Sequence, residues 1–152
     1  MTPEQRLEQG GLTLPALRPP AGNYVGSVRV GELLFLSGQG ADGHVGRVGA
    51  ELDVEAGRLA ARDCMLNLLA QARAALGSLD RVVRPVKMLG LVACSEDFTA
   101  TPSVIDGASE VLHLAFGEEA GRHARSAVGV QALPLGFAVE IELIVQARGE
   151  DA

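Results

Sequence analysis

The feature that most constrains the fold is a stripe of apolar residues with helical spacing between positions 54 and 76. Its members recur every three or four residues: Ala61, Cys64, Met65, Leu68, Leu69, Ala72, Ala75 and Leu76. This spacing predicts one long helix with a single buried face. Asp53 is a suitable N-cap for it, and Gly77 is a suitable end.

A second stripe, from Val104 to Ala115, predicts another long helix. It follows Thr101-Pro102, which is typical of a capped helix start, and Gly117 is expected to close it. Residues 117–125 then form a charged loop. Thr2-Pro3-Glu4 carries the same start signal, so a short N-terminal helix is expected over residues 3–9.

Five segments have the composition of strands. They are residues 25–30, 33–37, 86–94, 127–133 and 138–147. The first two are expected to form a hairpin. The third is nearly continuous in apolar residues, which favours a central strand whose pairing starts after Pro85. Pro134-Leu135-Gly136 reads as the turn of a second hairpin that joins the last two strands.

The order β-β-α-β-α-β-β predicts an α+β fold. The simplest architecture is a single mixed β-sheet with two long helices on one face. The other face is then left half apolar and uncovered, which predicts a homo-oligomer. The 152 residues fit one domain, residues 1–152, with a core over residues 20–147.

Composition excludes several classes of protein. The net charge of −6 and an aromatic content of 3% argue against a nucleic-acid-binding protein. No apolar run approaches membrane-spanning length, and the N-terminus lacks the pattern of a signal peptide. Two cysteines do not make a disulfide framework. We therefore expect a cytoplasmic protein without membrane or nucleic-acid partners.

The histidine, cysteine and serine residues show no motif for metal binding or nucleophilic catalysis. His44, His113 and His123 lack ligand spacing, so no metal site is expected. The glycine-rich loop after Phe35 lacks a phosphate-binding pattern and is interpreted as a flexible turn between strands. Cys64 and Cys94 lie in apolar segments and are interpreted as core cysteines. The sequence does not exclude a Ser–His–Asp triad, but Ser37 does not lie in a nucleophile elbow.

The most informative segment is residues 121–142, which contains Arg125 at the mouth of a strand. A guanidinium group there can bind a carboxylate through two parallel hydrogen bonds. Glu140 is expected across the second hairpin and, in a suitable register, on the same sheet face, where it can position or deprotonate a water molecule. The alternative is an ordinary surface salt bridge between Arg125 and a glutamate.

The sequence resembles the RidA/YjgF family. The C-terminal part of the resemblance runs through Ala124-Arg125-Ser126-x-Val128-x-Val130, Leu133-Pro134 and Val139-Glu140-Ile141-Glu142. The N-terminal part is Gly22-Asn23-Tyr24-Val25 followed by Leu36-Ser37-Gly38-Gln39. The resemblance covers about residues 20–147, and these motifs are specific when taken together.

This resemblance implies a chorismate-mutase-like fold and a homotrimer with clefts between subunits. It also implies hydrolysis of reactive enamine and imine intermediates to 2-oxo acids and ammonia, without a cofactor. Arg125 would bind the carboxylate of a small metabolite, and Glu140 would position water. Tyr24 would line the pocket from a neighbouring subunit. Ser37 and Gly38 would form its wall.

The sequence departs from the family pattern at several positions and looks like a divergent branch. Ala127 stands where a cysteine is typical, so only its backbone N–H can contribute. Asp106 stands in place of a typical asparagine, and its carboxylate would oppose an anionic substrate if it faced the pocket. Asn23 replaces a proline. His123 beside Arg125 either helps to hold an anion or lies in solvent.

Three functions compete on the sequence alone. The first is imine hydrolysis. The second is a non-catalytic trimer that binds small carboxylated metabolites. The third is a ribonuclease, a label attached to relatives, and the acidic net charge argues against it.

Overall fold

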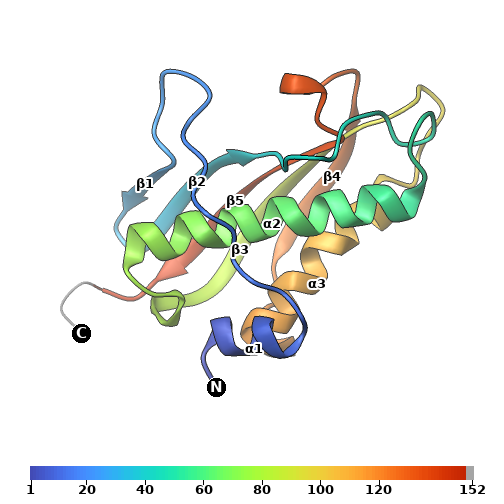
Figure 1. Cartoon of the computed structure of the whole chain (residues 1–152). Helices are drawn as coiled ribbons and strands as arrows, with labels where there is room; N and C mark the ends of the chain where they lie inside the picture. Colours follow the sequence, from blue (N-terminus) through green and yellow to red (C-terminus); the bar gives the residue numbers. More distant parts are fainter. Residues whose placement is uncertain (150–152) are drawn as a thin grey trace.

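The computed structural model describes residues 1–149 and contains one five-stranded mixed sheet (Figure 1). The strand order is β1-β2-β5-β3-β4. β3 and β4 are parallel, and the other neighbours are antiparallel. The bounds are β1 Ser27–Val30, β2 Leu33–Gln39, β3 Val82–Ala93, β4 Ala124–Val130 and β5 Val139–Ala147.

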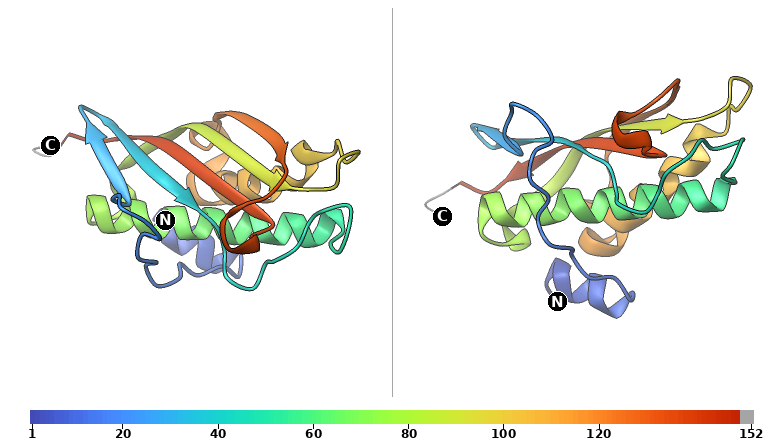
Figure 2. Two further views of the ribbon diagram at one scale, coloured as in Figure 1. Left: turned by 90° about the horizontal axis from the view of Figure 1, so that it is seen from above. Right: turned by 45° about the horizontal axis from the view of Figure 1, so that its top comes forward.

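Both long helices cover the same face of this sheet. α2 (Val54–Leu76) packs on β2 and β5, and α3 (Thr101–Ala120) packs on β3 and β4. Figure 2 shows the two helices below the sheet and the opposite face uncovered. The short α1 (Pro3–Gln9) packs against α3. The predicted α+β architecture, a single mixed sheet with two long helices on one face, is confirmed.

α2 forms as its sequence pattern indicates. The side chain of Asp53 accepts a hydrogen bond from the Ala56 backbone N–H, which satisfies one donor of the first turn. Gly77 ends the helix in the left-handed region at φ 88°, where a side chain would be strained. Most of the apolar stripe is fully buried and forms the centre of the core against β2 and β5.

The start and end of α3 differ from the prediction. Ala100 is the N-cap, and Thr101 instead donates its hydroxyl to the Ala127 carbonyl oxygen at 3.0 Å. Gly117 bends the chain at φ 88° without ending the helical segment, which continues to Ala120. The expected loop from 117 therefore contains a further helical turn, and β4 begins at Ala124, earlier than predicted.

The prediction of a second hairpin is wrong. β4 and β5 are not neighbours, because β3 lies between them and bonds to both. Leu133 to Phe137 form a crossing loop with the short helical turn η2 (Pro134–Gly136). β3 also begins before Pro85 rather than after it. At Pro85 only β5 is paired with β3, so the missing N–H can face the unpaired side.

The uncovered sheet face is apolar at its β1 and β2 end. Val28, Val30, Leu33 and Phe35 all lie on it and are 38% to 62% exposed. A monomeric soluble protein rarely shows a contiguous apolar surface of this kind on a sheet. No helix among the residues described is long and apolar enough to cross a membrane.

The close packing of α2 and α3 depends on Gly107. A Cβ atom built there would lie 2.2 Å from the backbone oxygen of Arg58 in α2. We expect Gly107→Ala to lower the free energy of unfolding by about 2 kcal/mol or more, because backbone must move to admit the methyl group. Chemical denaturation measures it. Ser103→Ala, on the exposed side of α3, is the matched control and should change it by less than about 0.5 kcal/mol. Equal stabilities of the two variants would contradict the packing.

Candidate functional site

Arg125 lies on β4, the strand at one edge of the sheet, with its side chain directed toward α3. It is in register with Met88, which is completely buried under the helices. Its guanidinium donates to Ser109 Oγ at 2.8 Å and to the Pro102 backbone oxygen at 3.1 Å, and it forms an ion pair with Asp106 Oδ1 at 2.9 Å. Two of the five guanidinium N–H groups thus donate hydrogen bonds, and the ion pair with Asp106 adds a contact between opposite charges.

A chain of hydrogen bonds continues from Arg125 through Ser109 to His123. His123 Nδ1 lies 2.7 Å from the Gly121 carbonyl oxygen, which can only accept, so Nδ1 carries the proton. His123 Nε2, 2.9 Å from Ser109 Oγ, is then free to accept the serine hydroxyl proton. Ser109 Oγ in turn accepts from Arg125. We call Asp106, Ser109, His123 and Arg125 the Arg125 cluster.

The electrostatics of the Arg125 cluster favour a neutral histidine. Burial lowers the pKa of His123 most, and His113 and the Arg125 guanidinium lower it further, against the hydrogen bond to Gly121. The Arg125 side chain is 22% exposed and that of Asp106 is 50% exposed. The cluster borders an open depression of 420 Å³ that His113 and Arg122 also line.

Glu140 lies on the opposite face of the sheet. It alternates with the buried Val139 and Ile141 on β5 and is paired with Leu91. A Cβ atom at Gly38 would lie 3.2 Å from Glu140 Cδ, so the carboxyl group packs directly on that glycine. We call Gly38 and Glu140 the Glu140 corner. Burial, and secondarily the charge of Glu142, raise the pKa of Glu140, which suits a group that must take up a proton.

The other predicted site residues are dispersed. Ser37, beside the Glu140 corner on β2, donates its hydroxyl to the Val25 carbonyl oxygen at 2.6 Å. Tyr24 precedes β1 at the far edge of the sheet, is 49% exposed, and its hydroxyl accepts from the Ala21 N–H at 3.3 Å. Ala127 lies two residues beyond Arg125 on β4, and its carbonyl oxygen is held by Thr101.

One chain therefore holds two half-sites that do not meet. The Arg125 cluster and Ala127 lie at the β4 edge on the helix side. The Glu140 corner and Ser37 lie on the open face, and Tyr24 lies beyond β1. The expectation that Arg125 and Glu140 face each other across a hairpin fails, because β3 separates their strands and the two side chains point to opposite faces.

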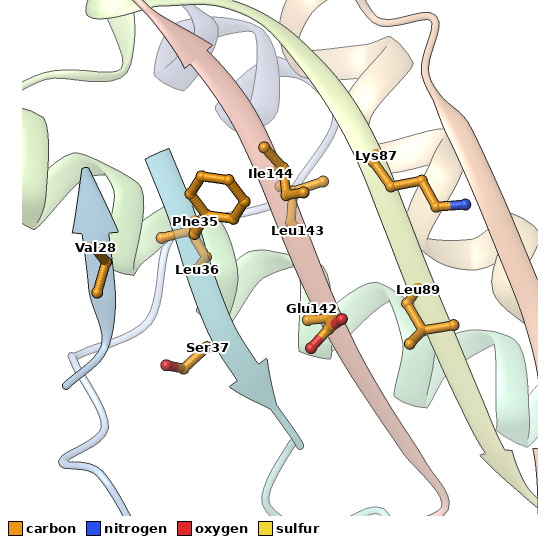
Figure 3. A pocket seen from close by; sticks show the side chains of 9 residues that line it. All are labelled: Val28, Phe35, Leu36, Ser37, Lys87, Leu89, Glu142, Leu143 and Ile144. Atoms are coloured by element: carbon orange, nitrogen blue, oxygen red, sulfur yellow. The ribbon is translucent and has the colours of Figure 1, made fainter. Parts of the chain in front are cut away.

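The open face also contains a hollow of 310 Å³, drawn in Figure 3. Phe35, Leu89 and Ile144 give it mainly apolar walls, and Lys87 and Glu142 are its charged side chains. In Figure 3 Lys87 points away from Glu142, and its ammonium lies 3.4 Å from Ser126 Oγ. The hollow lacks a cluster of polar groups directed inward, so we interpret it as part of a packing surface.

The residues described hold no group of three or more His, Cys, Asp or Glu side chains that could bind a metal ion. Both cysteines are buried, and burial raises the pKa of the Cys64 thiol, which disfavours the nucleophilic thiolate.

Comparison with known proteins identifies the family. The family model described as Endoribonuclease L-PSP matches residues 15–147, which include both half-sites. The chain belongs to the endoribonuclease L-PSP family. This family includes the RidA and YjgF proteins, so the resemblance seen in the sequence is confirmed at the level of the family.

Three proteins are similar to this L-PSP family member over most of its length. Protein TCP17 of Trypanosoma cruzi is 47% identical over 92% of this chain and 91% of its own. The crystal structure of Atu1372 from Agrobacterium tumefaciens, a protein of unknown function, is 39% identical, with a TM-score of 0.89 over 97% of this chain and 93% of that one. RidA from the Antarctic bacterium Psychrobacter sp. is 31% identical, with a TM-score of 0.57 over 86% and 93%.

Sequence reasoning missed Ser109 and left the orientation of Asp106 and His123 open. Asp106 and Ser109 lie three residues apart in a helix, and this spacing places them on one face. That signal was present in the sequence. Their contact with Arg125 required knowing that α3 crosses over β4.

The neutral His123 of this L-PSP family protein should make its stability depend on pH. The pKa of His123 lies below the ordinary value of 6.5, so the unfolded chain takes up a proton first as the pH falls. The free energy of unfolding should therefore decrease as the pH falls below about 6.5, and level off below the pKa of the folded state.

Denaturation profiles of His123→Gln against pH measure this contribution. The variant should lose this part of the decrease, in addition to a pH-independent loss of about 1 kcal/mol for the hydrogen bond to Ser109. His44→Gln is the control, because His44 pairs with Asp63 at 2.7 Å and not with the Arg125 cluster. This variant should retain the decrease in the free energy of unfolding that His123 causes. Parallel profiles for His123→Gln and the unmodified protein would show that His123 is not held in its neutral form.

Proposed function

We propose that this protein hydrolyses small reactive enamine and imine intermediates, as 2-imino acids, to 2-oxo acids and ammonia. The observation that carries the proposal is the guanidinium of Arg125, which is held by two hydrogen bonds and an ion pair at a sheet edge and borders an open depression. Membership of the family that includes RidA supports it.

In the proposed reaction, Arg125 holds the carboxylate of the 2-imino acid through its remaining N–H groups. Glu140 accepts a proton from a water molecule that adds to C2 of the imine. The tetrahedral adduct then transfers its hydroxyl proton to nitrogen and the C–N bond breaks. The departing ammonia takes the proton from Glu140 and leaves as ammonium, which restores the carboxylate. Neither metal nor organic cofactor is needed, because a protonated imine is already electrophilic and orientation supplies much of the rate.

We propose that the complete site forms between subunits of a homotrimer. The Arg125 cluster and the Glu140 corner point to opposite faces in one chain, so they can act on one molecule only if each comes from a different copy. The exposed apolar side chains of the open face offer a surface for this assembly. Tyr24, at the β1 edge, would reach the neighbour's Arg125 cluster, with Ser37, Gly38 and Ala127 lining the cleft.

A second candidate is a non-catalytic trimer that binds a small carboxylated metabolite. The position of Arg125 and Glu140 on opposite faces of one chain favours it, because the guanidinium can bind a carboxylate even where Glu140 is not placed to activate water. This alternative is correct if calorimetry detects binding of 2-oxo acids and the protein does not accelerate the decay of the free imine. The ribonuclease implied by the family's name fits poorly with a net charge of −6 and no tryptophan.

A mixing experiment tests the proposed site. Arg125→Ala and Glu140→Gln should each lower turnover of 2-iminobutanoate at least about 100-fold. Trimers prepared from an equal mixture of the two variants should regain about a quarter of the activity per site of the unmodified protein. Half of the subunits supply an intact Arg125, and half of their neighbours supply an intact Glu140. A coupled assay of imine decay measures both.

The mass of each variant in solution and its circular dichroism spectrum serve as controls for assembly and folding. Ser103→Ala, mixed with the unmodified protein, should leave the activity unchanged. A mixture as inactive as its two components would contradict a site shared between chains. Full activity of Arg125→Ala alone, or a monomeric protein that turns over the imine, would overturn the proposal.

A further inference from the structure

Among the residues that the structure describes, Asp106 is the one carboxylate in contact with Arg125, and only one of its oxygens takes part. Oδ1 lies 2.9 Å from the guanidinium, and the side chain is 50% exposed. Oδ2 accepts no hydrogen bond from the residues that the structure describes, and the group borders the depression beside Arg125. The site therefore offers a ligand an unused carboxylate oxygen directly beside unused guanidinium N–H groups.

The surrounding charges are almost balanced. Arg122, on the rim, has Glu119 as its partner at 3.6 Å, and His113 lies 3.7 Å from Glu118. Arg58, whose charge Asp106 also senses, is bonded to Glu110. Arg125 and Asp106 thus present one positive and one negative group side by side, with little excess of either sign nearby.

This pair fits a zwitterion better than a simple anion. A 2-oxo acid is attracted by Arg125 and repelled by Asp106, so much of the attraction is cancelled. A protonated 2-imino acid carries its carboxylate and its cationic nitrogen on adjacent carbon atoms. Each of its charges can therefore meet the opposite charge of the Arg125–Asp106 pair.

We propose that Asp106 is a specificity-determining residue that accepts a hydrogen bond from the cationic nitrogen of the substrate while Arg125 holds the carboxylate. This inference rests on the proposed function and adds to it the selection of the protonated imine. The balanced reaction is R–C(=NH₂⁺)–COO⁻ + H₂O → R–C(=O)–COO⁻ + NH₄⁺. The 2-oxo acid left behind has no cationic nitrogen, so Asp106 no longer attracts it and favours its release.

Binding of two stable ligands tests the inference without any turnover. L-2-aminobutanoate is a zwitterion, and 2-oxobutanoate is an anion of nearly the same size. Calorimetry on the unmodified protein should give at least tenfold tighter binding of L-2-aminobutanoate. In Asp106→Asn, which keeps the shape and removes the charge, 2-oxobutanoate should bind about tenfold more tightly and L-2-aminobutanoate about tenfold more weakly.

Glu110→Gln is the matched control. Glu110 lies one helical turn beyond Asp106, is exposed, and pairs with Arg58 rather than Arg125, so this variant removes one negative charge from the same helix. It should leave both affinities within about twofold. An equal effect of both variants would show that only the net charge of α3 matters, and the inference would then be wrong.

The outcomes separate this inference from the proposed function. If the unmodified protein binds the two ligands equally, or binds neither, Asp106 does not select a cationic nitrogen, whatever the hydrolysis assay shows. If the preference and its reversal in Asp106→Asn are found but imine decay is not accelerated, Asp106 selects zwitterions and the protein is a binding module.

Discussion

The parallel pairing of β4 with β3 is the constraint on which the rest of the structure depends. Parallel strands need a crossover connection, and α3 supplies it over one face of the sheet. The helix then lies directly over the strand it leads into, and Thr101 bonds to the backbone of Ala127. Any β4 side chain on that face meets α3. Arg125 therefore reaches Ser109 and Asp106 instead of bulk water.

Local patterns in the sequence were sufficient for the elements but not for their order in the sheet. The Asp53 cap and the apolar stripe after it fix α2 through contacts within a few residues. The turn signal at Pro134–Gly136 is also local. It is the same whether the two flanking strands pair with each other or have another strand between them. The nearly continuous apolar run of β3 already favoured a central position, with a neighbour on each side.

The error in strand order explains why the site was only half predicted. Arg125 was identified because a guanidinium at a strand mouth is visible in the sequence. The face on which Glu140 lies depends on register, and an offset of one residue moves a side chain to the other face. With β3 inserted, Arg125 is aligned with the buried Met88, whereas Glu140 is aligned with Leu91 on the open face. Asp106 can be singled out in the sequence, but its contact with Arg125 is long-range and follows only from the crossover.

The separation of the two half-sites also bears on the kind of assembly that could unite them. The Arg125 cluster lies at the β4 edge, whereas Tyr24 lies at the opposite edge and Glu140 on the open face. A two-fold dimer buries the same patch on both copies, so that one patch would have to contain both the Arg125 cluster and the Glu140 corner. A head-to-tail ring joins unlike surfaces, and it completes every site only if it closes. A cyclic trimer, as proposed above, is a small closed ring of this kind, and its closure would also remove the apolar open face from water.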